Sequence, residues 1–89
     1  MKKSSKLFGN LKASNVAEDT LYLINDQHNT FDHVINCLVT ICDHDELQAE
    51  QCALITHYKG SCEIAFGDTN DLIPLQEDLI LYGLDVEII

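Results

Sequence analysis

The sequence predicts a single α+β domain in which three helices pack on a small three-stranded antiparallel sheet, in the order β-α-α-β-α-β. Three observations predict this class. Apolar residues recur at helical spacing over residues 31–42, they alternate at strand spacing from residue 61 and again from residue 84, and turn formers separate these stretches. A chain of 89 residues is one domain, too small for a large internal cavity.

The first strand is predicted over residues 20–24, a mostly apolar and β-prone run that Asn25 and Asp26 end as turn formers do. We expect Asn29 to cap the helix that follows, because its side-chain oxygen can accept from the free backbone N–H groups one turn on. That helix is predicted over residues 30–42, where the apolar side chains from Phe31 onward share one helix face. Asp32 in its first turn places a negative charge at the positive end of the helix dipole.

The second helix is predicted from Asp45 to about His57. Asp45 is followed three residues later by Gln48, which is the spacing of a capping pair at a helix start. Gly60 stands just past the end, where its access to left-handed backbone angles favours a helix stop. A strand over residues 61–66 is predicted next, because every second side chain in it is apolar: Cys62, Ile64 and Phe66.

The third helix is predicted over residues 72–82 from its one proline and the glycine that follows. Pro74 lacks a backbone N–H, so only the first turn of a helix would hold it without losing a hydrogen bond. Gly83 is then the expected stop. A final strand is predicted from Leu84, because apolar and acidic residues alternate from there to Ile88.

Charge divides the chain into a basic N-terminal extension, residues 1–17, and an acidic folded domain, residues 18–89. Four of the five basic residues precede residue 13, whereas all 15 acidic residues lie from Glu18 onward. The extension lacks hydrophobic periodicity, so we expect it to be flexible and to act as a solubilising terminus or as a tail offered to a partner. An acidic domain repels phosphate backbones, which argues against a nucleic-acid partner except through the extension.

Four cysteines and four histidines make metal binding and catalysis the obvious alternatives. Cys37 and Cys42 are five positions apart on one helix and point about 140° apart, and no C-x-x-C motif occurs. His33 and Cys37 share a helix face, but two ligands do not make a structural site. Cys52 and His57 are also five positions apart, which separates a nucleophile from its base. We therefore expect no metal, no cofactor and no enzymatic activity.

The setting expected from the sequence is reduced and cytoplasmic. No signal-like apolar segment opens the chain, and no apolar run is long enough to span a bilayer. The cysteines are then expected to stay as thiols, as they do in that compartment. A membrane partner is not expected.

Four runs of residues resemble the ClpS adaptor family of the ATP-dependent Clp protease. They are Leu23-Ile24-Asn25-Asp26, Asn29-Thr30-Phe31-Asp32-His33-Val34-Ile35, Gln48-Ala49-Glu50-Gln51-Cys52-Ala53 and His57-Tyr58-Lys59-Gly60. The resemblance covers roughly residues 20–89 and is most specific over 23–60. It implies a non-enzymatic adaptor that binds N-degron substrates, proteins with a destabilising bulky N-terminal Leu, Phe, Tyr or Trp. It also implies delivery of these substrates to the N-terminal domain of a Clp-type AAA+ unfoldase.

The resemblance also implies which residues form the binding site. Asn25, Asp26 and His57 match the positions around the free α-amino group of the substrate, with Asn29 as the helix cap at the pocket rim. The implied hydrophobic pocket consists of Phe31, Val34, Ala53, Thr56 and Leu84. A protonated α-amino group has three donors and no acceptor, so amide, carboxylate and neutral imidazole acceptors suit it. Because a protonated imidazole cannot accept, we expect weaker binding in acid.

Three positions depart from the family pattern. Phe31 and Ala53 stand where many members have methionine, and Gln27 stands where an aspartate is usual. The first two changes predict a deeper pocket with a narrower mouth that accepts large aromatic side chains such as that of Trp. The loss of a carboxylate at Gln27 predicts some loss of affinity for the ammonium group.

Each candidate residue also has an interpretation that needs no ligand. Asn25 and Asp26 could be only a strand-ending turn, His57 could complement the dipole at a helix C-terminus, and Phe31 and Val34 could be core. The alternative function is therefore an interaction module of the ClpS fold without N-terminal-residue recognition, because a fold alone does not fix a function.

Overall fold

The computed structural model describes residues 18–89. The expected basic extension, residues 1–17, lies outside the described residues. The elements in chain order are β1 (Asp19–Ile24), α1 (Phe31–Cys42), α2 (Glu46–Lys59), β2 (Ser61–Gly67), α3 (Thr69–Leu81) and β3 (Val86–Ile88). The β-α-α-β-α-β order predicted from the sequence is confirmed, as are the three helices and the three-stranded sheet.

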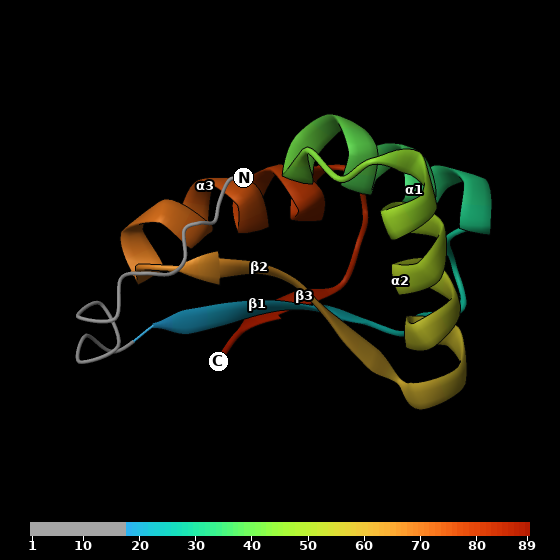
Figure 1. Ribbon diagram of the computed structural model, residues 1–89, viewed down its shortest axis with the longest axis horizontal. Coiled ribbons are helices and arrows are strands. Elements are labelled where there is room, and N and C mark those ends of the chain that lie inside the picture. Colours follow the sequence, from blue (N-terminus) through green and yellow to red (C-terminus); the bar gives the residue numbers. More distant parts are fainter. Residues whose placement is uncertain (1–17) are drawn as a thin grey trace.

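The sheet has the strand order β2-β1-β3, and both outer strands pair antiparallel with the central β1. All three helices lie on one face of this sheet (Figure 1). Beyond the end of β3, Thr20 and Ile89 exchange two backbone hydrogen bonds of 3.0 and 2.9 Å. The last residue is therefore held beside the beginning of β1, at the end of that strand opposite Asn25.

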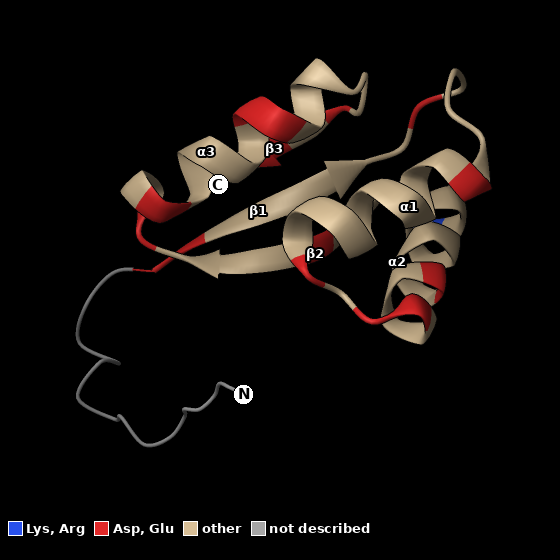
Figure 2. Ribbon diagram, turned by 90° about the horizontal axis from the view of Figure 1, so that it is seen from above, with Lys and Arg blue, Asp and Glu red and all other residues tan. Residues whose placement is uncertain are grey.

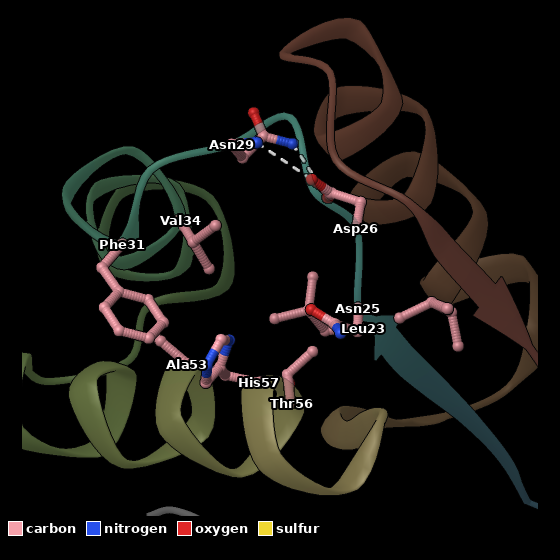
Figure 3. Close-up of a pocket in the computed structure, with 10 residues that line it drawn as sticks. Leu23, Asn25, Asp26, Asn29, Phe31, Val34, Ala53, Thr56 and His57 are labelled. Atoms are coloured by element: carbon pink, nitrogen blue, oxygen red, sulfur yellow. Dashed lines mark hydrogen bonds between the residues drawn. The ribbon is translucent and has the colours of Figure 1, made fainter.

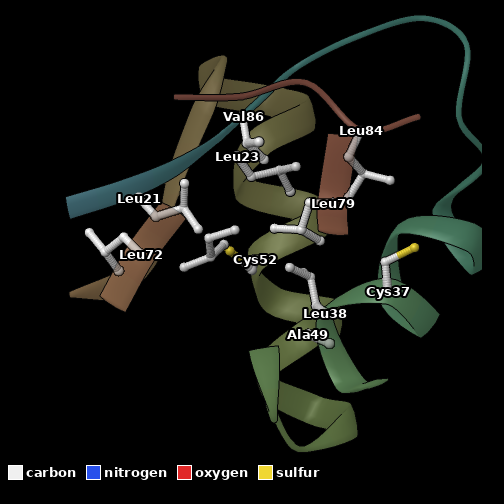
Figure 4. Close-up of a cluster of buried hydrophobic side chains, with 11 residues drawn as sticks. Leu21, Leu23, Cys37, Leu38, Ala49, Cys52, Leu72, Leu79, Leu84 and Val86 are labelled. Atoms are coloured by element: carbon white, nitrogen blue, oxygen red, sulfur yellow. The ribbon is translucent and has the colours of Figure 1, made fainter. Parts of the chain in front are cut away.

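The core lies between the sheet and its covering helices (Figure 4). Its most deeply buried large side chains are leucines from β1, α1 and α3: Leu21, Leu23, Leu38, Leu72 and Leu79. Burying each one contributes about 1.5–3 kcal/mol relative to exposure. Since three separate elements supply these side chains, the core fixes how α1 and α3 sit over β1.

The helix caps follow the sequence at α2 but not at α1. Asp45 caps α2 by accepting from the Gln48 backbone N–H at 2.8 Å, and Gly60 ends the helix with a left-handed φ of 99°. In α1 the N-cap is Thr30, whose hydroxyl accepts from the His33 backbone N–H at 3.1 Å. The prediction of Asn29 as the cap is wrong, because its side chain is used by other partners described below.

The start predicted for α3 is also wrong. The helix begins at Thr69, three residues earlier than expected, so Pro74 lies beyond the first turn. Its first turn is closed by the carbonyl of Asp68, which accepts from the backbone N–H groups of Asp71 and Leu72 at 2.9 and 3.1 Å. The proline deprives the carbonyl four residues earlier of its partner. That carbonyl belongs to the exposed Asn70, where water can replace the lost donor.

A β-bulge changes which side of β2 faces the core. The pairing between β1 and β2 shifts after Leu21, and Ile64 is the extra residue on β2. The predicted alternation therefore breaks. Phe66 was expected to face inward with Ile64, but it is 62% exposed. An extra residue in one strand reverses the faces of everything that follows it.

Acidic residues are spread over the helices, strands and turns of the described domain (Figure 2). Lys59 is the single lysine or arginine among residues 18–89. A surface of this kind attracts cationic groups and repels anionic ones. No helix in the described part of the chain is both long and apolar enough to cross a bilayer.

Candidate functional site

A small hollow opens where the end of β1 meets α1 and α2. Its volume is about 50 Å³, room for about three to five water molecules at ~10–15 Å³ each. The residues that line it are Leu23, Ile24, Asn25, Asp26, Asn29, Phe31, Val34, Ala53, Thr56 and His57 (Figure 3). The structure thus brings together all the site residues predicted from the sequence except Leu84.

Leu84 lies in the hydrophobic core instead of in the wall of the hollow. It was expected to open the last strand, but β3 begins at Val86. The chain turns between α3 and β3 at this point, and the Leu84 backbone N–H donates to the carbonyl of Leu79 at 3.0 Å. This turn places the side chain among the core leucines (Figure 4). The pocket role predicted for Leu84 is therefore not supported by its position.

The floor of the hollow is apolar and buried. Leu23, Ala53 and Thr56 come from β1 and α2, and each is buried. The Thr56 hydroxyl donates to the backbone oxygen of Cys52 at 2.8 Å, so its polar atom already has a partner inside the helix. Leu23 was not predicted as a site residue. The sequence does contain a signal for it, because Leu23 alternates with Leu21 and stands two positions before Asn25.

Two aromatic rings stand at the rim. Phe31 at the start of α1 and His57 near the end of α2 meet edge to face, with ring centroids 5.4 Å apart and an interplanar angle of 80°. Phe31 remains 45% exposed in this contact, and His57 is exposed as well. Both rings therefore have surface free for a ligand that enters the hollow between the two helices (Figure 3).

The carboxylate of Asp26 is held by the loop that follows it. It accepts from the backbone N–H groups of His28 and Asn29 at 2.8 and 2.9 Å, and from the side-chain nitrogen of Asn29 at 2.9 Å. Partial burial raises the pKa of Asp26, but these hydrogen bonds outweigh burial and hold the pKa below its ordinary value. The carboxylate therefore keeps its negative charge at neutral pH.

Asn29 connects this loop to a distant turn. Its side-chain nitrogen donates both to Asp26 and, at 2.9 Å, to the backbone oxygen of Gly83 after α3. These bonds orient the side-chain nitrogen of Asn29 towards Asp26 and Gly83, and the Thr30 hydroxyl caps α1 instead. Asn29 still lines the hollow. Asn29 therefore lies at the rim, as expected from the sequence analysis, but it does not cap α1.

Gly60 fixes the two sides of the site relative to each other. Its left-handed backbone ends α2 three residues after His57, and its carbonyl accepts from the Asn25 backbone N–H at 2.9 Å. The backbone N–H of Ile24 donates to the carbonyl of Asp85 at 2.8 Å on the other side of β1. The end of β1 that carries the exposed Asn25 side chain is therefore hydrogen-bonded on both sides, and one of these bonds joins it to the residue that ends α2.

The arrangement suits an amphipathic cation better than a metal. A carboxylate, an amide and an imidazole surround one end of the hollow, and buried apolar side chains form its floor. Hydrogen-bond acceptors grouped at one end suit a charged donor, while the floor suits a hydrocarbon group. Within residues 18–89, no group of three or more His, Cys, Asp or Glu side chains is arranged to hold a metal ion.

A family comparison agrees with this geometry. The model of the family described as "ATP-dependent Clp protease adaptor protein ClpS" matches residues 18–84. The chain belongs to the ClpS family. The match includes every residue that lines the hollow, from Leu23 to His57. An adaptor role in the ClpS family is therefore the general function of this chain.

A solved ClpS structure has the same fold. It is that of Agrobacterium tumefaciens ClpS2 bound to L-phenylalaninamide, with a TM-score of 0.65 and 14% sequence identity. The alignment covers 81% of the present chain and 96% of the ClpS2 chain. At this identity, the likeness to ClpS2 shows the fold alone. A comparison with curated proteins gives no match.

Proposed function

We propose that this ClpS-family chain binds proteins with a bulky hydrophobic N-terminal residue, Leu, Phe, Tyr or Trp, and delivers them to a Clp-type AAA+ unfoldase. The observation that carries the proposal is the hollow, which combines a polar rim with a buried apolar floor. An N-terminal residue has the same two parts. Its α-amino group is cationic, and its side chain begins one carbon away.

The polar rim can satisfy the α-amino group. An ionised carboxylate offers about four acceptor positions, and three N–H groups of the loop already approach Asp26. One position is then left for the substrate ammonium, with Asn25 and His57 as further acceptors. Hydrogen bonds that involve a charged group contribute about 1.5–3 kcal/mol each. An acetylated N-terminus has lost its charge and two of its donors, so it should bind poorly.

The apolar floor can hold the first side chain. Burying a Leu or Phe side chain contributes about 1.5–3 kcal/mol. After the cost of association, a dissociation constant on the order of micromolar, about −8 kcal/mol, follows. A. tumefaciens ClpS2 is bound to L-phenylalaninamide, a ligand with an α-amino group and a benzyl side chain. We extend this ligand chemistry to the present chain.

The residues at the rim and floor support tolerance for the largest side chains. Ala53 is buried in the floor and is among the smallest residues that could stand there. Phe31 and His57 meet edge to face at the rim and leave ring surface for aromatic contacts. Offset and edge-to-face contacts with a substrate ring add about 0.5–1.5 kcal/mol beyond area burial. We therefore include Trp among the accepted N-terminal residues.

The proposal is tested with labelled peptides that differ only in the first residue: Phe, Leu, Trp, Ala or acetyl-Phe. Fluorescence polarisation should give micromolar binding of the Phe, Leu and Trp peptides and at least tenfold weaker binding of the other two. His57→Ala should abolish the preference. His28→Ala is the matched control, because His28 is an exposed histidine in the loop between β1 and α1 and does not line the hollow. Its affinity should stay within about twofold.

The alternative is an interaction module of the same fold that does not recognise N-terminal residues. Equal affinity for all five peptides would favour it. Delivery is tested separately by adding the chain to a Clp-type unfoldase and its protease with a reporter protein that begins with Phe. Degradation that depends on the chain and on the first residue supports delivery, whereas peptide binding without faster degradation contradicts it.

A further inference from the structure

Two of the four cysteines meet where α2 packs on β2. The thiols of Cys52 and Cys62 donate to one acceptor, the backbone oxygen of Glu63, at 3.8 and 3.5 Å. Both cysteines are free thiols in the structure. Cys52 on α2 and Cys62 on β2 therefore direct their thiols to the same carbonyl oxygen.

The two thiols differ in access. Cys52 is only 4% exposed, whereas Cys62 is half-buried and can be reached from solvent. Burial, the neighbouring Cys62, Cys42 and Glu63 all raise the pKa of the Cys52 thiol. A thiol of this kind reacts slowly with reagents in solution. Cys62 is therefore the entry point, and Cys52 is positioned to react with whatever forms on Cys62.

We propose that Cys52 and Cys62 form a redox-active dithiol that a small disulfide, such as oxidised glutathione, converts to an internal disulfide. The Cys62 thiolate attacks one sulfur of the small disulfide, whose S–S bond breaks and releases one thiol. The Cys52 thiolate then attacks the Cys62 sulfur and releases the second thiol. The protein loses two protons and two electrons, and the small disulfide gains them as it becomes two thiols.

The dithiol is connected to the hollow through α2. The backbone oxygen of Cys52 accepts from the Thr56 hydroxyl at 2.8 Å, and the next residue is Ala53. Ala53 and Thr56 belong to the floor of the hollow. Since a disulfide brings its sulfurs to about 2.05 Å, it draws this turn of α2 towards β2. We expect the oxidised form to bind N-terminal Phe peptides at least threefold more weakly, a consequence that rests on the proposed function.

The lysine positions permit a direct test. Trypsin cleaves after lysine, and Lys59 separates the two thiols in sequence. Cleavage after Lys12 and Lys59 gives fragment 13–59, which holds Cys37, Cys42 and Cys52, and fragment 60–89, which holds Cys62 alone. The full chain is treated with oxidised glutathione, its free thiols are blocked with N-ethylmaleimide, and the digest is analysed by mass spectrometry without reductant.

The expected product is fragment 13–59 joined to fragment 60–89 within one chain, and it should separate on reduction. Cys52→Ala should abolish the link, while Cys42→Ala should keep it. Because Cys52 is buried, its variant is checked by circular dichroism, and Cys62→Ala provides a second variant at a less buried position. The proposal is overturned by a link that survives Cys52→Ala, by a stable glutathione adduct on Cys62 alone, or by a link between two chains.

The effect of oxidation on peptide binding is measured separately from the linkage between the two tryptic fragments. Reduced and oxidised protein are titrated with the Phe peptide, and Cys62→Ala is titrated after the same oxidation as the control. Weaker binding only in the oxidised protein with both cysteines supports the connection to the hollow. Equal affinity of the two forms contradicts that connection. If the reduced protein binds no peptide, the proposed function is contradicted instead. The fragment linkage still shows whether Cys52 and Cys62 form a disulfide.

Discussion

The side-chain nitrogen of Asn29 donates to the backbone oxygen of Gly83 at 2.9 Å, across 54 positions of the sequence. The same amide donates to the carboxylate of Asp26. The loop at the rim of the hollow is therefore tied to the turn between α3 and β3. The residues that line the hollow come from the first 57 positions, but their geometry depends on a segment near the C-terminus.

Asn29→Ala should lower the free energy of unfolding by about 1–3 kcal/mol, because it removes the side-chain hydrogen bonds to the charged Asp26 carboxylate and to the Gly83 carbonyl. Urea denaturation measures this change. Gln27→Ala is the control, since Gln27 is exposed in the same loop, and its effect should stay within about 0.5 kcal/mol. Equal effects of the two variants would mean that the amide of Asn29 contributes nothing to stability.

The pKa of Asp26 predicts an acid-dependent loss of stability. The pKa is below the ordinary value of 3.8 in the folded state, so ionised Asp26 stabilises the fold above the unfolded-state pKa. This stability is lost as the pH falls through the folded-state pKa. The unfolding free energy should therefore fall less steeply for Asp26→Asn than for the parent chain between about pH 5 and 2.5. Glu50→Gln, at an exposed position on α2, should follow the parent curve.

Thr30→Ala should cost about 1 kcal/mol of stability through loss of the N-cap of α1. Thr40→Ala is the matched control in the same helix, because the Thr40 hydroxyl donates to the carbonyl of Asn36 inside the helix and caps nothing. Its effect should be a few tenths of a kcal/mol. Thermal unfolding followed by circular dichroism compares the two variants. A larger loss at Thr40 would contradict the assignment of the cap.

Phe31→Ala should weaken binding of an N-terminal Phe peptide about tenfold, or about 1.4 kcal/mol, because the ring is part of the rim. Phe66→Ala removes the same side chain from the outer face of β2, where Phe66 is 62% exposed. Both variants should keep most of the parent stability. Peptide affinity should change only in the first, and a similar loss in both would argue against a rim role for Phe31.

Ala53→Met should narrow the floor and change the preference among N-terminal residues. We expect about tenfold weaker binding of the Trp peptide and less than about threefold weaker binding of the Leu peptide, since overpacking costs about 1–3 kcal/mol where space is short. Leu54→Met, exposed one position further along α2, is the control. If the parent chain binds Leu tightly and excludes Trp, the inferred pocket depth is wrong.

Local signals in the sequence were sufficient wherever a local interaction decides the structure. Asp45 and Gly60 bound α2 as predicted, because a cap depends on residues three or four positions away. Pro74 and Phe66 were interpreted wrongly for different reasons. The exposed turn before Pro74 replaces a lost hydrogen-bond partner with water, and the bulge at Ile64 arises from pairing with another strand. Neither effect can be predicted from the residues next to Pro74 or Phe66.

The site was predicted from the resemblance to a family, because periodicity alone would assign Phe31 and Val34 to the core. The hollow now contains the residues that the resemblance implied over 25–57. The resemblance also implied a pocket role for Leu84, and alternation placed it in the last strand, but the side chain packs in the core and β3 begins at Val86. The bond between Asn29 and Gly83 could not be foreseen, since no local pattern reports a contact between distant loops.

The pairing of Thr20 with Ile89 determines how this protein can be handled. At about 3.3 Å per residue, β1 places Ile89 roughly 17 Å from Asn25 and thus from the hollow. A dye or biotin attached to the last residue would lie at the end of the molecule opposite the rim. In copies immobilised on a sensor surface through that residue, the hollow would point away from the surface. Peptide in solution could then reach it.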